Sequence, residues 1–135
     1  AATPSIWPTI GWVSSFVGSR PDPFTGDPSV HHGLDISADA GRPVYATASG
    51  TVESAGWNGN YGNLVVIDHG YGLKTRYGHL SKITVRVGQS ISRGDQVGNV
   101  GMTGRATGPH LHYEVLADGK SINPLRLLTL TSPRN

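Results

Sequence analysis

The chain has 135 residues, a formal net charge of +2 and no cysteine. This length fits one domain, and the lack of cysteine excludes both a disulfide framework and a zinc site built from thiolates. The basic residues are spread out, with no dense run suited to a phosphate backbone, so nucleic acid is not an expected partner.

The first part of the chain, residues 1–30, shows no clear periodicity. We expect an irregular N-terminal segment that packs on the rest of a single domain spanning residues 1–135. Prolines and a glycine mark turns in this segment. The aromatic residues that could hold it down are Trp7, Trp12, Phe16 and Phe24.

Short apolar stretches follow at close intervals, and 19 glycines, about twice the usual share, are scattered among them. This pattern predicts β-strands joined by tight turns. The expected strands are residues 34–37, 44–48, 50–55, 64–69, 73–80, 83–87, 96–100 and 111–116. Hairpin turns are expected at Asn58-Gly59 and Asp118-Gly119. The predicted fold class is therefore all-β, a mainly antiparallel, sandwich-like domain.

The chain ends in a pattern typical of a short helix. Asn123 is a favoured N-cap residue, and Pro124 suits the first helical position. Leucines at positions 125, 127 and 128 follow. A short C-terminal helix is predicted.

The first candidate site segment is His31-His32-Gly33-Leu34-Asp35. In an extended chain, residues an even number apart point to the same face, so His31 and Asp35 can share one site while Leu34 turns into the core. Gly33 adds no side chain that would crowd a metal. A turn with polar residues entering a strand explains the same segment equally well.

The second segment, residues 110–115, alternates between polar and apolar side chains, as a strand with one buried face does. The apolar positions are Leu111, Tyr113 and Val115. The other face carries His110, His112 and Glu114, a set that suits metal binding better than an ordinary solvent face.

Three further histidines remain, His32, His69 and His79. His32 and His69 are interpreted as structural, and a lone histidine such as His79 would most often be structural too. Three ligands with one open position would make a catalytic zinc site. The residues alone nominate His31, Asp35 and one of His110 and His112, without choosing between these two.

Taken together, these motifs resemble the lysostaphin-type, or M23, zinc metallopeptidases. The similarity extends from about Trp7 to Leu127 and rests on His31-x-x-x-Asp35 and His110-x-His112. Further matching stretches are residues 16–20, 62–70, 77–80, 87–104 and 122–124.

The resemblance implies that His31, Asp35 and His112 bind one Zn²⁺ per chain, and that His79 and His110 are catalytic without binding the metal. It also implies a groove across the central sheet with the zinc on its floor. Zinc activates water at neutral pH, which suits hydrolysis. Glu114, on the same strand face as His112, is predicted to orient an imidazole from behind, with a role at the rim of the groove as the alternative.

The activity implied is that of a zinc metallo-endopeptidase acting on peptidoglycan cross-links. The stretch from Arg20 to Gly26 and residues 76–80 look more like the relatives that cut D-alanyl–diaminopimelate cross-links than like those that cut glycine bridges. The substrate class implies a periplasmic or secreted protein, and a monomer is favoured. No stretch approaches the roughly 18 apolar residues of a membrane span, and residues 1–5 lack the features of a signal peptide.

Two alternatives have other functions. An M23-like domain that has lost activity could bind the cell wall or regulate another hydrolase, but such domains usually lack some of the five key residues. Residues 85–97 also resemble the hairpins of biotinyl or lipoyl carriers. The turn at residues 101–104 has no lysine for attachment, which disfavours a carrier.

Overall fold

The computed structural model describes residues 3–15, 18–21, 28–31 and 33–128. For the described residues from 15 to 31, it describes the backbone alone. The strands pair in antiparallel fashion throughout, so the predicted all-β class is confirmed. No helix within this part of the chain is long and apolar enough to cross a membrane.

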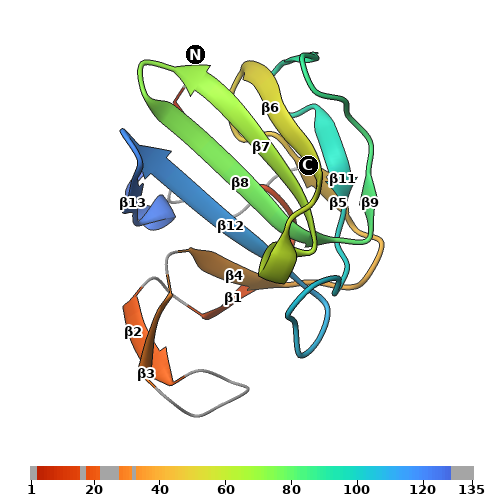
Figure 1. Cartoon of the computed structure of the whole chain (residues 1–135), viewed down its shortest axis with the longest axis vertical. Coiled ribbons are helices and arrows are strands. Elements are labelled where there is room, and N and C mark those ends of the chain that lie inside the picture. The colour runs from red at the N-terminus through yellow and green to blue at the C-terminus, as the bar shows by residue number, and fades with distance from the viewer. Residues whose placement is uncertain (1–2, 16–17, 22–27, 32, 129–135) are drawn as a thin grey trace.

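The largest sheet is curved and has eight strands (Figure 1). Its order is β1 (Trp12–Ser15), β4 (Leu34–Ser37), β12 (His110–Ala117), β8 (Leu73–Leu80), β7 (Asn63–Gly70), β6 (Gly50–Trp57) and β10 (Ser90–Ile91), and β13 (Lys120–Ile122) also pairs with β12. The functional residues considered below come mainly from β4, β12 and β8, in the middle of this sheet.

Two smaller sheets complete the fold. One has the order β5 (Pro43–Tyr45), β11 (Gln96–Asn99) and β9 (Lys82–Ile83), and the other pairs β2 (Gly18–Pro21) with β3 (Pro28–His31). The hydrophobic core joins the first of these to the large sheet: Val44 and Val97 are fully buried in one cluster with Ile36 and Leu111. The sandwich-like arrangement follows from this shared core.

The predicted strands agree with the observed ones to different degrees. Strands 34–37 and 73–80 have the predicted bounds, and most others differ by one or two residues at an end. The predicted strand 83–87 shortens to β9, and β10 and β13 were not predicted. These short strands lie at sheet margins, where few residues carry the alternating pattern.

The prediction of an irregular N-terminal segment holds for residues 3–11, which form no strand, but not for the described residues after them. Strands β1, β2 and β3 lie in it, and β1 pairs with β4 along the edge of the large sheet. Their partners are supplied by the fold, so short Ser-, Gly- and Pro-rich stretches become strands without a local signal. Trp7 does pack against the core, whereas Trp12 is 77% exposed. Phe16 and Phe24 lie outside the described residues.

The turn predictions were partly correct. Asp118 and Gly119 both have left-handed backbones, with φ of 51° and 80°, and join β12 to β13 as a tight hairpin turn. Asn58-Gly59 instead leads into a 3₁₀ turn, η1 (Gly59–Tyr61), between β6 and β7. The C-terminal helix is the single 3₁₀ turn η2 (Pro124–Arg126), capped as predicted by the side chain of Asn123.

Candidate active site

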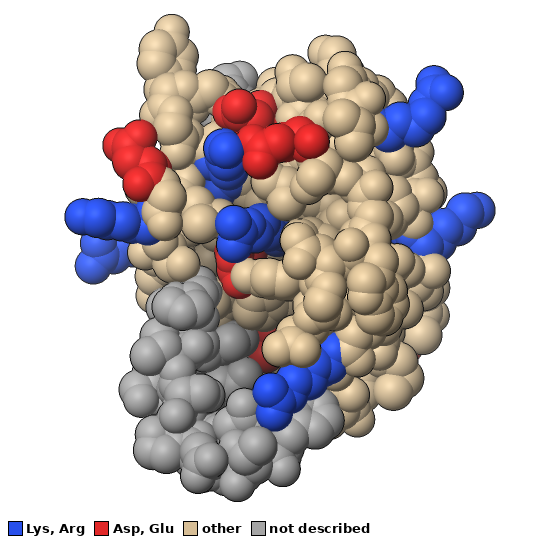
Figure 2. Space-filling view, in the orientation of Figure 1, with Lys and Arg blue, Asp and Glu red and all other residues tan. Residues whose placement is uncertain are grey.

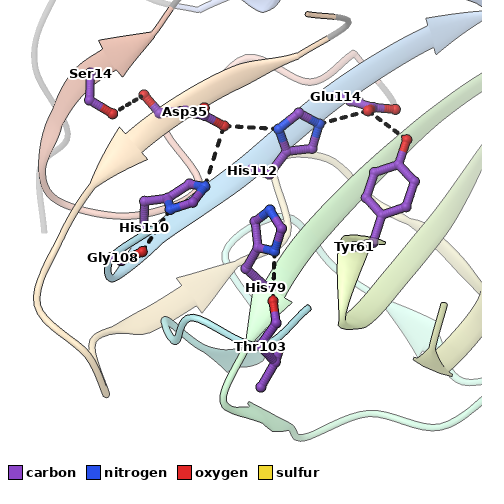
Figure 3. A network of polar contacts seen from close by, with 9 residues as sticks. All are labelled: Ser14, Asp35, Tyr61, His79, Thr103, Gly108, His110, His112 and Glu114. Carbon is purple, nitrogen blue, oxygen red and sulfur yellow. Dashed lines mark hydrogen bonds and ion pairs between the residues drawn. The ribbon is translucent and has the colours of Figure 1, made fainter. Parts of the chain in front are cut away.

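Strands β4 and β12 bring the two candidate segments together. Asp35 pairs with His112 across the strands, in register. Leu34 and Leu111 are fully buried on the core side of the sheet. Because side chains alternate along a strand, Asp35, His110 and His112 project from the opposite face, where Figure 3 shows them side by side. The predicted alternation of residues 110–115 is confirmed.

Asp35 lies at the centre of the site. Its Oδ1 is 2.9 Å from Nδ1 of His112 and 3.7 Å from Nε2 of His110. Nδ1–H of His110 donates to the carbonyl oxygen of Gly108 at 2.9 Å, so Nε2 is the nitrogen turned toward Asp35. The Asp35 and His112 residues are each only 8% exposed. The two imidazoles and the carboxylate therefore converge in a largely desolvated place.

His79 joins this group through a backbone irregularity in β8. Tyr77 pairs with Val65 and Leu80 with Asn63, so Gly78 and His79 together oppose one residue of β7. Such a bulge re-aims the side chains at that point. His79 also has a φ of 62°, which is uncommon for a residue with a side chain. Its ring lies 4.7 Å from that of His110 and 6.0 Å from that of His112.

The surroundings of the histidines separate their proton affinities. Burial lowers the pKa of His79 to about 4, so its ring is neutral at pH 7. Burial alone would lower the pKa of His112 as well, but hydrogen bonds to the carboxylates of Asp35 and Glu114 raise it to about 9. The space beside His112 therefore favours positive charge, as a cation site requires.

Glu114 stands behind His112. Its Oε2 is 2.7 Å from Nε2 of His112, the ring nitrogen turned away from Asp35. Burial would raise the pKa of Glu114, but the hydrogen bond and charge of His112 are the main effects that lower it to about 2. Glu114 is only 2% exposed, so it does not lie on a solvent-exposed rim.

Two residues of this site were missed by the sequence interpretation, Tyr61 and Arg76. Both contact Glu114. Arg76 could have been found, because Glu114 and Arg76 are directly opposed in the pairing of β12 with β8. Tyr61 lies in η1, which has no periodic pattern, so no signal in the sequence joins it to Glu114.

The donor set fits a metal ion such as zinc. Asp35 Oδ1 and His112 Nδ1 face each other at hydrogen-bond distance, and carboxylate oxygen and imidazole nitrogen are natural zinc ligands. The described backbone places His31 at the end of β3, while its side chain lies outside the described residues. Among the side chains that the structure describes, no three candidate ligands form a metal-binding group.

His69 is separate from this site. His69 is 6% exposed, with Nδ1 at 2.7 Å from the carbonyl oxygen of Ser49 and Nε2 at 2.8 Å from Oγ1 of Thr75. Its predicted structural role is confirmed by these contacts. His32 lies outside the described residues.

Charge on the face seen in Figure 2 is mixed. Lys and Arg side chains on this face occur singly or in small groups, and several lie beside acidic groups. Lys74 pairs with Glu53 at 2.6 Å, for example, and Arg76 pairs with Glu114 at 3.1 Å. Within the described part of this face there is thus no continuous basic surface of the kind that binds nucleic acid.

A carboxylate and three imidazoles on one face of an antiparallel sheet are characteristic of a metal-dependent hydrolase. The model of peptidase family M23 matches residues 29–124, and the chain belongs to this family. The resemblance found in the sequence is thereby confirmed.

Curated relatives agree with this assignment. The peptidoglycan DD-endopeptidase ShyA of Vibrio cholerae is 44% identical over 113 residues, which cover 84% of this chain and 26% of ShyA. The DD-carboxypeptidase/endopeptidase Mpg of Neisseria meningitidis is 42% identical over 84% of this chain and 26% of its own length. The chain thus spans about a quarter of these relatives.

Solved structures share the fold. A zinc-containing peptidase from Vibrio cholerae matches with a TM-score of 0.81 and 36% identity, over 96% of this chain and 40% of that chain. The catalytic domain of the antimicrobial peptidase lysostaphin from Staphylococcus simulans matches with a TM-score of 0.77 and 31% identity, over 84% of this chain and 89% of that domain.

Proposed function

We propose that this chain is the catalytic domain of a zinc metallo-endopeptidase that hydrolyses peptide bonds in peptidoglycan cross-links. The observation that carries the proposal is the Asp35–His112 pair, buried and flanked by His110 and His79 on one sheet face. Membership of family M23 and the names of the relatives support the substrate class.

The proposed bond is of the D-alanyl–diaminopimelate type. Relatives named DD-endopeptidases are up to 44% identical to this chain, and the lysostaphin catalytic domain is 31% identical over a similar share of it. A periplasmic or secreted location follows from such a substrate. We further propose that the domain acts as a monomer, since its candidate site is formed by residues of one chain.

In this proposal His31, Asp35 and His112 hold a single Zn²⁺. When bound, zinc supplies an activated water near neutral pH and polarises the scissile carbonyl. The carboxylate of Asp35 and Nδ1 of His112 already face each other, so ligand binding at these two residues needs little rearrangement.

His79 and His110 are proposed to move protons and to stabilise developing charge. Nδ1–H of His79 donates to the carbonyl oxygen of Thr103 at 2.7 Å, and Nδ1–H of His110 donates to that of Gly108. Each Nδ1 is engaged by a carbonyl oxygen, so Nε2 is the ring atom of His79 and of His110 that is available for proton transfer. Because the pKa of His79 is lowered to about 4, this ring stays neutral near pH 7 and is able to accept a proton there.

The test uses the intact chain with purified muropeptides of both cross-link types, with and without a chelator, and mass spectrometry of the products. We expect cleavage of the D-alanyl–diaminopimelate peptide that a chelator abolishes and zinc restores. His112→Ala should lose both zinc and activity. His79→Ala should keep one zinc and lose activity by about 10²–10⁴-fold.

Asp39→Asn is the matched control for Asp35→Asn, since Asp39 is exposed and lies outside the site. Only Asp35→Asn should weaken zinc binding. If the folded, zinc-loaded protein cut neither peptide but bound wall fragments, the enzyme proposal would fail. A binding or regulatory domain on the same fold would then be favoured.

A further inference from the structure

Glu114 accepts contacts on both of its carboxylate oxygens. Oε1 accepts from the Arg76 guanidinium at 3.1 Å. Oε2 accepts from the Tyr61 hydroxyl at 2.7 Å and lies 2.7 Å from Nε2 of His112. The side chain of Glu114 is 3% exposed, so these protein groups take the place of water around a buried carboxylate.

Tyr61 and Arg76 also contact each other. The Arg76 guanidinium lies 3.3 Å from the Tyr61 hydroxyl and 5.9 Å from the centre of the Tyr61 ring. The Tyr61 ring in turn lies 5.6 Å from that of His112, tilted by 57°. Figure 3 shows Tyr61 reaching Glu114 from the side opposite Asp35. Two residues from η1 and β8 thus fix a carboxylate on β12.

The position of Glu114 determines which nitrogen of His112 is available. A carboxylate only accepts hydrogen bonds, and each ring nitrogen of His112 faces one: Nδ1 faces Asp35 and Nε2 faces Glu114. A metal ion bound at Nδ1 would replace the proton there, while Glu114 holds the proton on Nε2. In the neutral ring the lone pair is then on Nδ1, the atom that faces Asp35. A rotated Glu114 would no longer hold the Nε2 proton or restrain the imidazole from this side.

We propose that Tyr61 and Arg76 are positioning residues that act through Glu114 to hold His112 in its metal-binding orientation and tautomer. This inference rests on the proposed role of His112 as a zinc ligand. It assigns to Tyr61 and Arg76 no contact with substrate. It also predicts that their effects on zinc binding depend on Glu114.

The experiment is a set of mutant cycles read out by zinc affinity, measured by competition with a chromogenic chelator on the intact, metal-free chain. Glu114→Gln should weaken zinc binding by about 10–100-fold, as loss of a partner behind a ligand does. Tyr61→Phe and Arg76→Gln should each weaken it by about 3–10-fold. In the Glu114→Gln background, either change should alter the zinc affinity by less than about twofold.

Matched controls remove a tyrosine hydroxyl and a positive charge elsewhere. Tyr71 is fully exposed, and Lys74 on β8 pairs only with the exposed Glu53 among the contacts described for it. Tyr71→Phe and Lys74→Gln should leave the zinc affinity unchanged. The nitrogen chemical shifts of His112 in the zinc-loaded chain give a second readout. A metal-bound Nδ1 with the proton on Nε2 should dominate in the parent, and mixed forms should appear in Glu114→Gln and in the double variant Tyr61→Phe/Arg76→Gln.

Zinc affinities within twofold of the parent in Tyr61→Phe and Arg76→Gln would overturn the inference. So would losses that stay the same size in the Glu114→Gln background, because they would show a purely structural role of η1 and β8. These outcomes do not depend on hydrolysis. If the parent binds zinc but cuts no muropeptide, the proposed function alone is refuted. If the parent cuts muropeptides but the losses of zinc affinity in the mutant cycles are additive, the inference alone is refuted.

Discussion

At the scale of single residues, Gly33 shows how closely the backbone approaches the candidate ligands. A Cβ at this position would lie 2.8 Å from Cε1 of His112, 2.8 Å from Cγ of Glu114 and 2.7 Å from the carbonyl oxygen of Tyr113. The ring of His112 therefore has room in the site only because Gly33 carries no side chain. The sequence interpretation expected this residue to keep the site clear.

Gly33→Ala should displace β4 from β12 or push the His112 ring out of place. We expect a loss of about 1–3 kcal/mol in the free energy of unfolding, because overpacking forces backbone shifts, together with weaker zinc binding. Urea unfolding and chelator competition measure the two effects.

Gly56→Ala is the matched control, since a Cβ on Gly56 would meet nothing within 4 Å. Its effect should be below about 1 kcal/mol. Equal stability and equal zinc affinity in the Gly33 and Gly56 variants would show that the close approach at Gly33 has no consequence.

The residues of the site differ in how far the sequence could predict them. The alternation in residues 110–115 placed His110, His112 and Glu114 on one face correctly, since a strand's faces follow directly from its period of two. His79 was different. Regular alternation from the buried Tyr77 would place it on the core side, and only the bulge and its positive φ bring it to the other histidines.

At the scale of elements, Thr103 connects the loop after β11 to two strands of the large sheet. Its hydroxyl donates to the carbonyl oxygen of Leu80 at 2.7 Å and accepts from the backbone N–H of Asn63 at 3.1 Å. Its carbonyl oxygen accepts from His79 at 2.7 Å. One residue thus ties the end of β8 and the start of β7 to a loop that orients a proposed catalytic imidazole.

Thr103→Val keeps the shape of the side chain but removes the hydroxyl. The N–H of Asn63 would lose its Thr103 partner. Since this place is only partly buried, the cost should not exceed the roughly 1–3 kcal/mol of an unsatisfied buried group. We expect lower stability in urea unfolding and a reduced rate of hydrolysis, with the zinc stoichiometry unchanged.

Thr103→Ser retains the hydroxyl and should behave nearly like the parent. A Thr103→Val protein as stable and active as Thr103→Ser would rule out this role for the hydroxyl. Such loop-to-strand contacts could not be predicted from the sequence, because they join residues 40 and 23 positions apart without any periodic pattern.

The same distinction applies to the elements as a group. Strands with several alternating or continuous apolar residues, such as β7 and β8, were predicted closely. β1 was not, because pairing with β4 makes it a strand while its own residues carry little pattern. The sequence thus determines the central strands locally, whereas long-range pairing determines the edge.

At the scale of the whole molecule, a buried polar network links the large sheet to the segment that follows β5. The Thr47 hydroxyl lies 3.1 Å from the Tyr77 hydroxyl and 2.7 Å from that of Tyr113. The Thr75 hydroxyl donates to Tyr77 at 2.8 Å and lies 2.8 Å from Nε2 of His69. A titratable ring is therefore part of the packing that holds the domain together.

His69 should make the stability of the domain depend on pH. Burial lowers the pKa of His69 below the ordinary value of 6.5. As the pH falls through 6.5 the unfolded chain takes up a proton at this ring, while the folded protein does not until a lower pH. Well above pH 6.5, protonation of His69 therefore does not affect the free energy of unfolding. As the pH falls from 6.5 toward the lowered pKa, the folded state loses stability. The loss for one proton is at most about 1.4 kcal/mol per pH unit.

Urea unfolding of the intact chain from pH 7.5 to 5 tests this dependence. His69→Gln should be less stable than the parent at pH 7.5, and its stability should fall less steeply toward pH 5. Since the other histidines are common to both proteins, the difference between the two slopes isolates His69. Proton NMR of the His69 ring should show titration below pH 6.5. A midpoint at or above 6.5, or parallel slopes in the two proteins, would contradict a neutral, buried His69 within this network.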